Sequence, residues 1–215
     1  MKNSIKKIAI AAFTFATIAS NAQTMEESLT AANKQLETSK TINEIMAASS
    51  AFDLVTSKYP NELMTNYYSV YSKAQASYVE KDAKKRDQIL DQADKYFQKV
   101  KALNPENDET YVLEALLANA RLQVDGSNRW KIYGDQFDKA LEKAKKLNPN
   151  NPRIYYLTGI SIFYKPVAFG GSGKKAKPYF EKAKMLFAAE DKKSILKPTW
   201  GEWPNEDCLK KCNDK

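Results

Sequence analysis

The chain has 215 residues, a formal net charge of +8 and no histidine. Hydrophobic residues make up 43% and charged residues 28%, a composition typical of a soluble protein with a sizeable core. Only seven glycines are present, which argues against a fold of many short strands and favours helices. Histidine is the commonest general base, and no acidic pair is spaced to share a buried site. We therefore expect no enzymatic activity, no cofactor and no metal site.

The first 22 residues have the layout of a secretory signal peptide. A basic start, "MKNSIKK", precedes the 12-residue apolar run "IAIAAFTFATIA", and small residues follow at Ser20 and Ala22. The run is too short to cross a bilayer comfortably, although an uncleaved anchor is the alternative. We therefore expect cleavage near Ala22, a periplasmic or secreted location, and no membrane span after cleavage.

Export leaves a mildly basic chain, because loss of Lys2, Lys6 and Lys7 lowers the formal charge from +8 to +5. The remaining lysines alternate with acidic residues, as in "DKALEKAKK", which is typical of solvated helix faces. A nucleic-acid-binding surface would need clustered arginines, which the chain lacks. We therefore expect no nucleic acid among its partners.

Four segments share one spacing of apolar residues. The apolar positions are separated by steps of four and three, so each segment predicts a helix with a single apolar stripe. A proline follows five residues later in three of the four segments and ends the helix there. We call these segments helix B. Their residues are Ala48, Phe52, Val55 and Pro60; Ala93, Phe97, Val100 and Pro105; Phe137, Leu141, Ala144 and Pro149; and Ala176, Phe180 and Ala183, with Ala188 in place of proline.

A second kind of helix, helix A, is predicted after each proline. An aromatic residue stands six positions beyond the proline, and a small residue that would let a neighbouring helix approach stands four positions later. The pairs are Tyr111 with Ala115, Tyr155 with Gly159, and a poorer copy, Asn66 with Val70.

The combined spacing resembles the tetratricopeptide (TPR) repeat over roughly residues 41–188, and the layout is similar to small exported bacterial TPR proteins of unassigned function. The resemblance implies an all-α fold, a right-handed α-solenoid of about three to four stacked helix hairpins. The helical repeat domain would occupy residues 23–188. Residues 189–215 would form a non-repeat tail that packs on or caps the array.

The repeats are longer than usual, since the two Leu-Asn-Pro marks lie 44 residues apart and a standard unit has about 34. The extra length falls between helix A and helix B. It either forms loops along one edge, carrying Tyr78, Trp130, Tyr133 and Phe169, or it lengthens helix A over those aromatic residues.

The stretch "FGGSGKK" invites comparison with a phosphate-binding loop but does not fit one. Ala168 stands where the first glycine is needed, and Lys175 stands where serine or threonine is needed. We expect a turn instead, with Pro166 ending one helix and the next beginning near Ser172 or Gly173.

In TPR proteins helix A lines the concave face, so the resemblance implies a groove formed by side chains next to the packing stripe. The groove would bind a protein or peptide of the cell envelope, which makes the chain a non-enzymatic interaction scaffold. The alternative is a small-ligand-binding accessory protein with a pocket between groove and tail, and Trp200 and Trp203 of the tail also need burial. The candidate partner-binding residues are Met64, Tyr67, Tyr71, Glu109, Val112, Leu116, Asn119, Arg153, Tyr156, Ile160 and Phe163.

Cys208 and Cys212 are the only cysteines and stand four residues apart near the end of the chain. An oxidising compartment permits a disulfide between them, but the bridge needs close Cα atoms and suitable Cβ directions. A bridged pair and two thiols are both open at this point.

Overall fold

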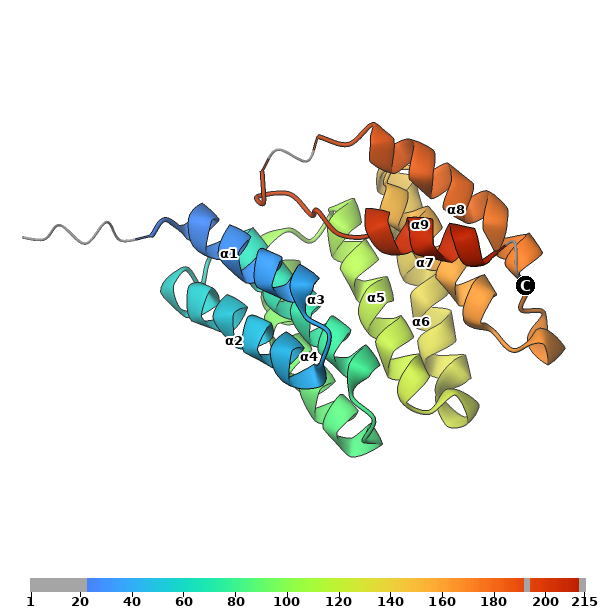
Figure 1. The fold of residues 1–215 in the computed structure, drawn as a ribbon, viewed down its shortest axis with the longest axis horizontal. Helices are drawn as coiled ribbons and strands as arrows, with labels where there is room; N and C mark the ends of the chain where they lie inside the picture. The colour runs from blue at the N-terminus through green and yellow to red at the C-terminus, as the bar shows by residue number, and fades with distance from the viewer. Residues whose placement is uncertain (1–22, 192–193, 213–215) are drawn as a thin grey trace, which may run out of the picture.

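The computed structural model describes residues 23–191 and 194–212, and over these residues it holds nine α-helices and no strand (Figure 1). The all-α prediction is therefore confirmed for this part of the chain. The helices are α1 (Met25–Thr38), α2 (Ile42–Lys58), α3 (Leu63–Val79), α4 (Ala83–Leu103), α5 (Asp108–Val124), α6 (Gly126–Leu147), α7 (Pro152–Tyr164), α8 (Gly173–Ala188) and α9 (Glu202–Lys211), with a 3₁₀ turn η1 (Val167–Phe169) before α8.

Capping residues and prolines set the helix boundaries. Thr24 and Thr41 begin α1 and α2 with reciprocal capping boxes, and Asn107 and Asn151 cap α5 and α7. Four helices, α2, α4, α6 and α7, each end two residues before a proline, as predicted. Ser172 caps α8, which also begins at the predicted place.

Consecutive helices pack as pairs, α1 with α2, α3 with α4, α5 with α6, and α7 with α8. The predicted stripes form the contacts, because Phe52, Phe97, Leu141 and Phe180 are all at most 7% exposed. Gly159 shows why a small residue is needed on helix A: a Cβ there would lie 2.6 Å from the Phe180 ring. Burial of these stripes against neighbouring helices is the main favourable term in the fold.

Helices α3, α5 and α7, the three predicted A helices, also contact one another in order and form one layer. In the view of Figure 1, α1 and α9 lie in front of this layer on opposite sides. None of the helices in the described residues is long and apolar enough to cross a membrane.

The extra repeat length is helical in two of the three places, and it lengthens helix B somewhat more than helix A, since the third pair, α7 and α8, has only 13 and 16 residues. Helices α4 and α6 have 21 and 22 residues, whereas α3 and α5 have 17 each. The prediction that four aromatic residues lie along one exposed edge holds only in part. Trp130 and Phe169 are 63% and 77% exposed, while Tyr78 and Tyr133 are half-buried.

The tail departs from the repeat. Gly201, with φ of 106°, turns the chain into α9, which packs on α8. Trp200 is buried at 7% exposure, but Trp203 is 77% exposed, so the expectation that both tryptophans are buried was wrong for Trp203. Cys208 and Cys212 are both buried as thiols, with no disulfide between them.

Candidate functional site

The face of α3, α5 and α7 that the repeat pattern predicts as a groove meets the tail. Nine of the eleven candidate residues line two cavities there, four in a polar cavity near the N-terminal ends of these helices and five in an aromatic cavity further along. Val112 and Phe163 line neither cavity and are buried at 0% and 4% exposure. The polar cavity receives Met64, Tyr67, Glu109 and Arg153, and the aromatic cavity receives Tyr71, Leu116, Asn119, Tyr156 and Ile160.

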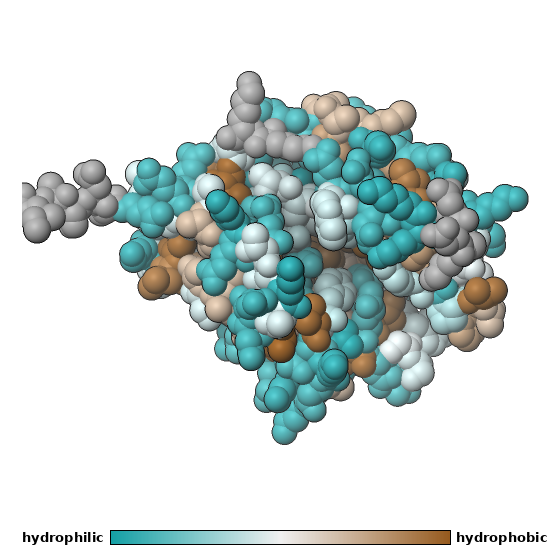
Figure 2. All heavy atoms as spheres, viewed as in Figure 1, coloured by the Kyte–Doolittle hydropathy of each residue, from teal (hydrophilic) through white to brown (hydrophobic). Residues whose placement is uncertain are grey.

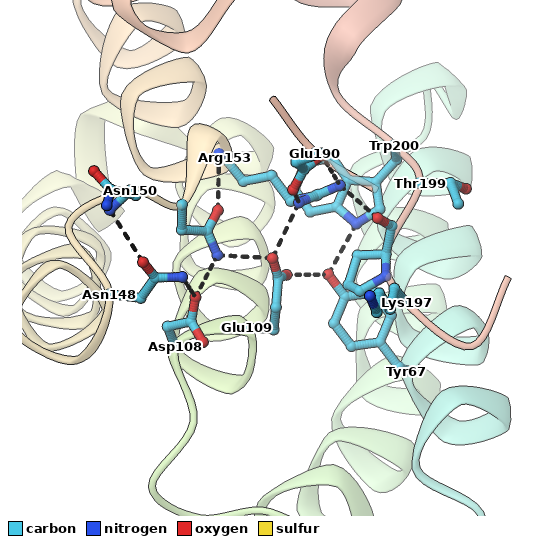
Figure 3. A network of polar contacts seen from close by, with 12 residues as sticks. Tyr67, Asp108, Glu109, Asn148, Asn150, Arg153, Glu190, Lys197, Thr199 and Trp200 are labelled. Atoms are coloured by element: carbon cyan, nitrogen blue, oxygen red, sulfur yellow. Dashed lines mark hydrogen bonds and ion pairs between the residues drawn. The ribbon is translucent and has the colours of Figure 1, made fainter. Parts of the chain in front are cut away.

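Arg153 lies at the centre of a polar network beneath the tail (Figure 3). Its guanidinium, 1% exposed, donates from Nη1 to Glu109 at 3.1 Å and to Glu190 at 2.7 Å. Its Nη2 donates to the Pro198 carbonyl at 2.6 Å. One buried cation therefore joins α5, the segment after α8, and the tail.

Tyr67 extends this network to α3. Its hydroxyl donates to Glu109 at 2.8 Å and accepts from the Trp200 indole N–H at 2.9 Å. The Arg153 guanidinium also lies over the Trp200 ring, 5.3 Å from its centroid, a cation–π contact. We call Tyr67, Glu109, Arg153, Glu190 and Trp200 the anchor network, because together they hold the tail against three helices.

Burial decides the protonation of this network. It raises the pKa of the Tyr67 hydroxyl well above 10, so the group stays neutral and can donate. Burial also raises the pKa of the Glu109 carboxyl above 4.5, against the opposing attraction of Arg153 and the hydrogen bonds from Tyr67 and Asn151. Glu109 thus occupies a site that disfavours its charge even with Arg153 in place.

A second tyrosine holds the tail from α3. The Tyr68 hydroxyl donates to the Lys197 carbonyl at 3.0 Å and accepts from the Thr199 backbone N–H at 3.1 Å. Its ring stacks on Phe52 of the first helix pair, with centroids 5.5 Å apart. Residues 197–200 are therefore bonded at several points to the predicted groove.

The polar cavity has a volume of about 420 Å³ and opens beside this network. Much of its polar lining is already paired within the protein. Asp108 accepts from Asn148 at 2.9 Å and from Asn151 at 2.8 Å, and Asn151 also donates to Glu109 at 2.7 Å. These bonds fix the loops before α5 and α7, which is a structural role.

The aromatic cavity, of about 270 Å³, is less occupied by internal bonds. Trp200 forms one wall and stacks on Tyr71 with centroids 4.9 Å apart and planes 19° apart. Figure 2 shows a hollow in this face beside α9, with hydrophobic residues in its floor. Its lining is Tyr71, Gln75, Tyr78, Leu116, Asn119, Gln123, Tyr156, Ile160, Tyr164, Trp200 and Pro204.

The polar side chains that line the aromatic cavity are uncharged, and some of them pair with one another. Tyr78 donates to Asn119 at 3.0 Å, and Gln123 donates to the same amide oxygen at 2.8 Å. Burial raises the pKa of the phenols of Tyr71, Tyr78 and Tyr156, so these rings stay neutral at physiological pH. The cavity therefore offers aromatic faces and neutral donors and acceptors rather than charge.

Sequence reasoning missed the parts of both cavities that lie off the A-helix stripe. Gln75 and Gln123 lie on α3 and α5 outside the predicted groove set, and Pro204 and Glu190 follow the repeats. The tail sequence "PTWGEWP" signalled that a tryptophan needs a buried place but not which place. Among the described residues, no group of three or more His, Cys, Asp or Glu side chains could hold a metal ion.

A solved structure of the HusA haemophore from Porphyromonas gingivalis is similar to this chain, with a TM-score of 0.73 and 27% sequence identity. The similarity covers 88% of this chain and 91% of that chain. No protein-family model and no curated protein matches the sequence. The resemblance to TPR proteins therefore stays a prediction, and the helix pairs and the haemophore-like fold are what the comparison supports.

Proposed function

We propose that this chain is a small-ligand-binding protein of the cell envelope or the extracellular space, and that the aromatic cavity takes a porphyrin such as haem. The observation that carries the proposal is an aromatic cavity, closed on one side by Trp200 of the tail, in a fold similar to that of a haemophore. The predicted signal peptide and the haemophore likeness both support an exported location.

The chemistry of the cavity suits a flat conjugated ring. Aromatic side chains bind such a ring through offset stacking and edge contacts, and four tyrosines and one tryptophan line the walls. At about 270 Å³ the cavity lies just below the roughly 300–1,000 Å³ typical of ligand sites. A porphyrin would therefore be held over part of its surface, with the rest covered by a shift of the tail or left in the hollow.

Binding would depend on the ring more than on its metal. The chain has no histidine, the commonest haem ligand, so in this cavity a tyrosine phenolate is the iron ligand to consider. Burial disfavours the phenolate of Tyr71, Tyr78 and Tyr156 by raising their pKa. We therefore expect a metal-free porphyrin to bind nearly as well as haemin.

The tail favours this proposal over the protein-scaffold prediction. An extended peptide in the predicted groove would have to occupy the place of residues 197–200, which are bonded to Tyr67, Tyr68 and Arg153. A small ligand in the aromatic cavity can leave these hydrogen bonds in place.

The test is a titration of the purified protein with haemin and with metal-free protoporphyrin, followed by Soret absorbance and tryptophan fluorescence. Ile160→Trp should fill the cavity and weaken binding of both porphyrins by about tenfold or more. Ile132→Trp is the matched control, because Ile132 is 70% exposed on α6, and it should bind as the wild type does.

Two results would overturn the proposal. One is a wild-type protein that binds neither porphyrin. The other is porphyrin binding that Ile160→Trp leaves intact while thermal unfolding shows both variants folded, since the ligand would then sit elsewhere.

A further inference from the structure

The turn between α7 and α8 presents apolar side chains to solvent. Val167 and Phe169 of η1 are 84% and 77% exposed, and Tyr164 at the end of α7 is 57% exposed. Figure 2 shows hydrophobic residues at the end of the molecule where Figure 1 places this turn. Adjacent exposed side chains of this kind mark interaction surfaces more often than isolated ones do.

The turn is built to hold those side chains outward. The Pro166 carbonyl accepts from the backbone N–H of Phe169 at 2.9 Å and of Gly171 at 3.2 Å. Gly170 is left-handed, with φ of 89°, and a Cβ at Gly171 would overlap the Lys165 carbonyl oxygen, so both glycines are needed for this shape.

Internal pairing also prepares this backbone for an apolar environment. The N–H groups of Phe169, Gly170, Gly171 and Ser172 all donate to carbonyls within the turn or α7. Unpaired backbone groups are costly to remove from water, so a turn with its amides already bonded can enter a bilayer interface at lower cost.

The unpaired charges in the sequence around the turn are positive. The sequence contains no acidic residue between Arg153 and Glu181, whereas Lys165, Lys174 and Lys175 are exposed beside the turn. Helix α9 brings Asp207 near Tyr164, but Lys211 pairs with that carboxylate. An exposed apolar tip within a ring of lysines complements an anionic lipid surface, where each nearby lysine adds attraction and the apolar groups insert.

We propose that the α7–α8 turn is a membrane-docking tip, with Val167 and Phe169 entering the interface of an anionic bilayer and Lys165, Lys174 and Lys175 contacting its headgroups. The tip spans the loop beyond α7 and the first turn of α8, and none of its five residues lines the aromatic cavity.

The experiment is co-sedimentation of the purified protein with phosphatidylcholine vesicles, with and without phosphatidylglycerol, at low and high salt. We expect binding only to the anionic vesicles, weakening as salt rises. The double variant Val167→Asp/Phe169→Asp should lower the partition coefficient by about tenfold or more. The control Trp130→Asp/Ile132→Asp, at 63% and 70% exposed positions on α6, should bind as the wild type does.

Absence of binding to anionic vesicles would overturn the proposal, as would equal loss in the α6 control. The tip could instead capture a membrane protein while protein-free vesicles stay unbound. That result would also overturn the proposal and would assign the surface to a protein partner. Porphyrin binding should be unchanged in the tip variant, so failure of this inference and failure of the ligand proposal give different results.

Discussion

Helix α7 contacts α8 and the tail by opposite chemistry. Against α8 the contact is apolar: Gly159 lies on the Phe180 ring, and Phe163 meets the same ring at 6.2 Å. Against the tail the contact is polar, centred on the buried guanidinium of Arg153. The first contact depends on volume and the second on charge balance, so the two should fail under different substitutions.

Loss of the buried cation should have the largest effect. Arg153→Met leaves Glu109 and Glu190 without their shared partner, and breaking a buried pair costs about 3–5 kcal/mol. Chemical denaturation should show this loss in the free energy of unfolding, and Trp200 fluorescence should move to longer wavelength as the tail loosens.

Arg121 provides the control, because it also pairs with several carboxylates but near the surface. Its partners Asp91 and Asp94 are 66% and 46% exposed, and exposed pairs contribute about 0–1 kcal/mol each. If Arg121→Met proves as destabilising as Arg153→Met, the anchor network is not what holds the tail.

A volume change should disturb the apolar contact by a smaller amount. Gly159→Ala places a methyl group 2.6 Å from the Phe180 ring, so we expect a loss of about 1–3 kcal/mol in unfolding free energy. Gly134→Ala on α6 meets nothing within 4 Å and should gain about 0.5–1 kcal/mol from better helix propensity. Opposite signs in thermal unfolding would support close α7–α8 packing, and a neutral Gly159→Ala would contradict it.

The two contacts also differ in how well the sequence predicts them. The apolar stripes repeat within a single helix, so steps of three and four identify Phe52, Phe97, Leu141 and Phe180 as buried without any knowledge of the fold. The repeat spacing also predicts that Tyr67, Glu109 and Arg153 share one face, because each lies in the first part of an A helix.

Their pairing could not be predicted in the same way. Arg153 meets Glu109 across 44 residues of sequence, and Trp200 meets Tyr67 across 133. No local period links such positions, and the path of the tail, which depends on Gly201 and on the Pro198 carbonyl, decides which face it covers. Because the path of the tail cannot be predicted from local spacing, the sequence offers a pocket between groove and tail only as an alternative to a peptide-binding groove.

The carboxyl groups of Glu109 and Glu44 should change stability with pH in opposite directions. We expect these changes in unfolding free energy to be the smallest of the predicted effects. Burial raises the folded-state pKa of Glu109 above 4.5, so its contribution is full below pH 4.5 and is lost as pH rises through the raised value. The capping hydrogen bonds from Lys40 and Thr41 lower the pKa of Glu44, so its contribution is present above pH 4.5 and is lost as pH falls.

Glutamine variants turn these opposite signs into a measurement. Neither Glu109→Gln nor Glu44→Gln titrates at the substituted position, so the wild-type minus variant free energy of unfolding, followed from pH 3 to pH 8, isolates each carboxyl group. The difference should fall with rising pH for Glu109 and rise for Glu44. Arg153 stays charged throughout this pH range, so it adds only a constant offset to the difference in unfolding free energy. The negative charge of Asp108 opposes that of Glu109, so it makes the difference fall more steeply as pH rises. Two parallel curves would mean that Glu109 is solvated like a surface carboxylate, and the tail could not then be covering it.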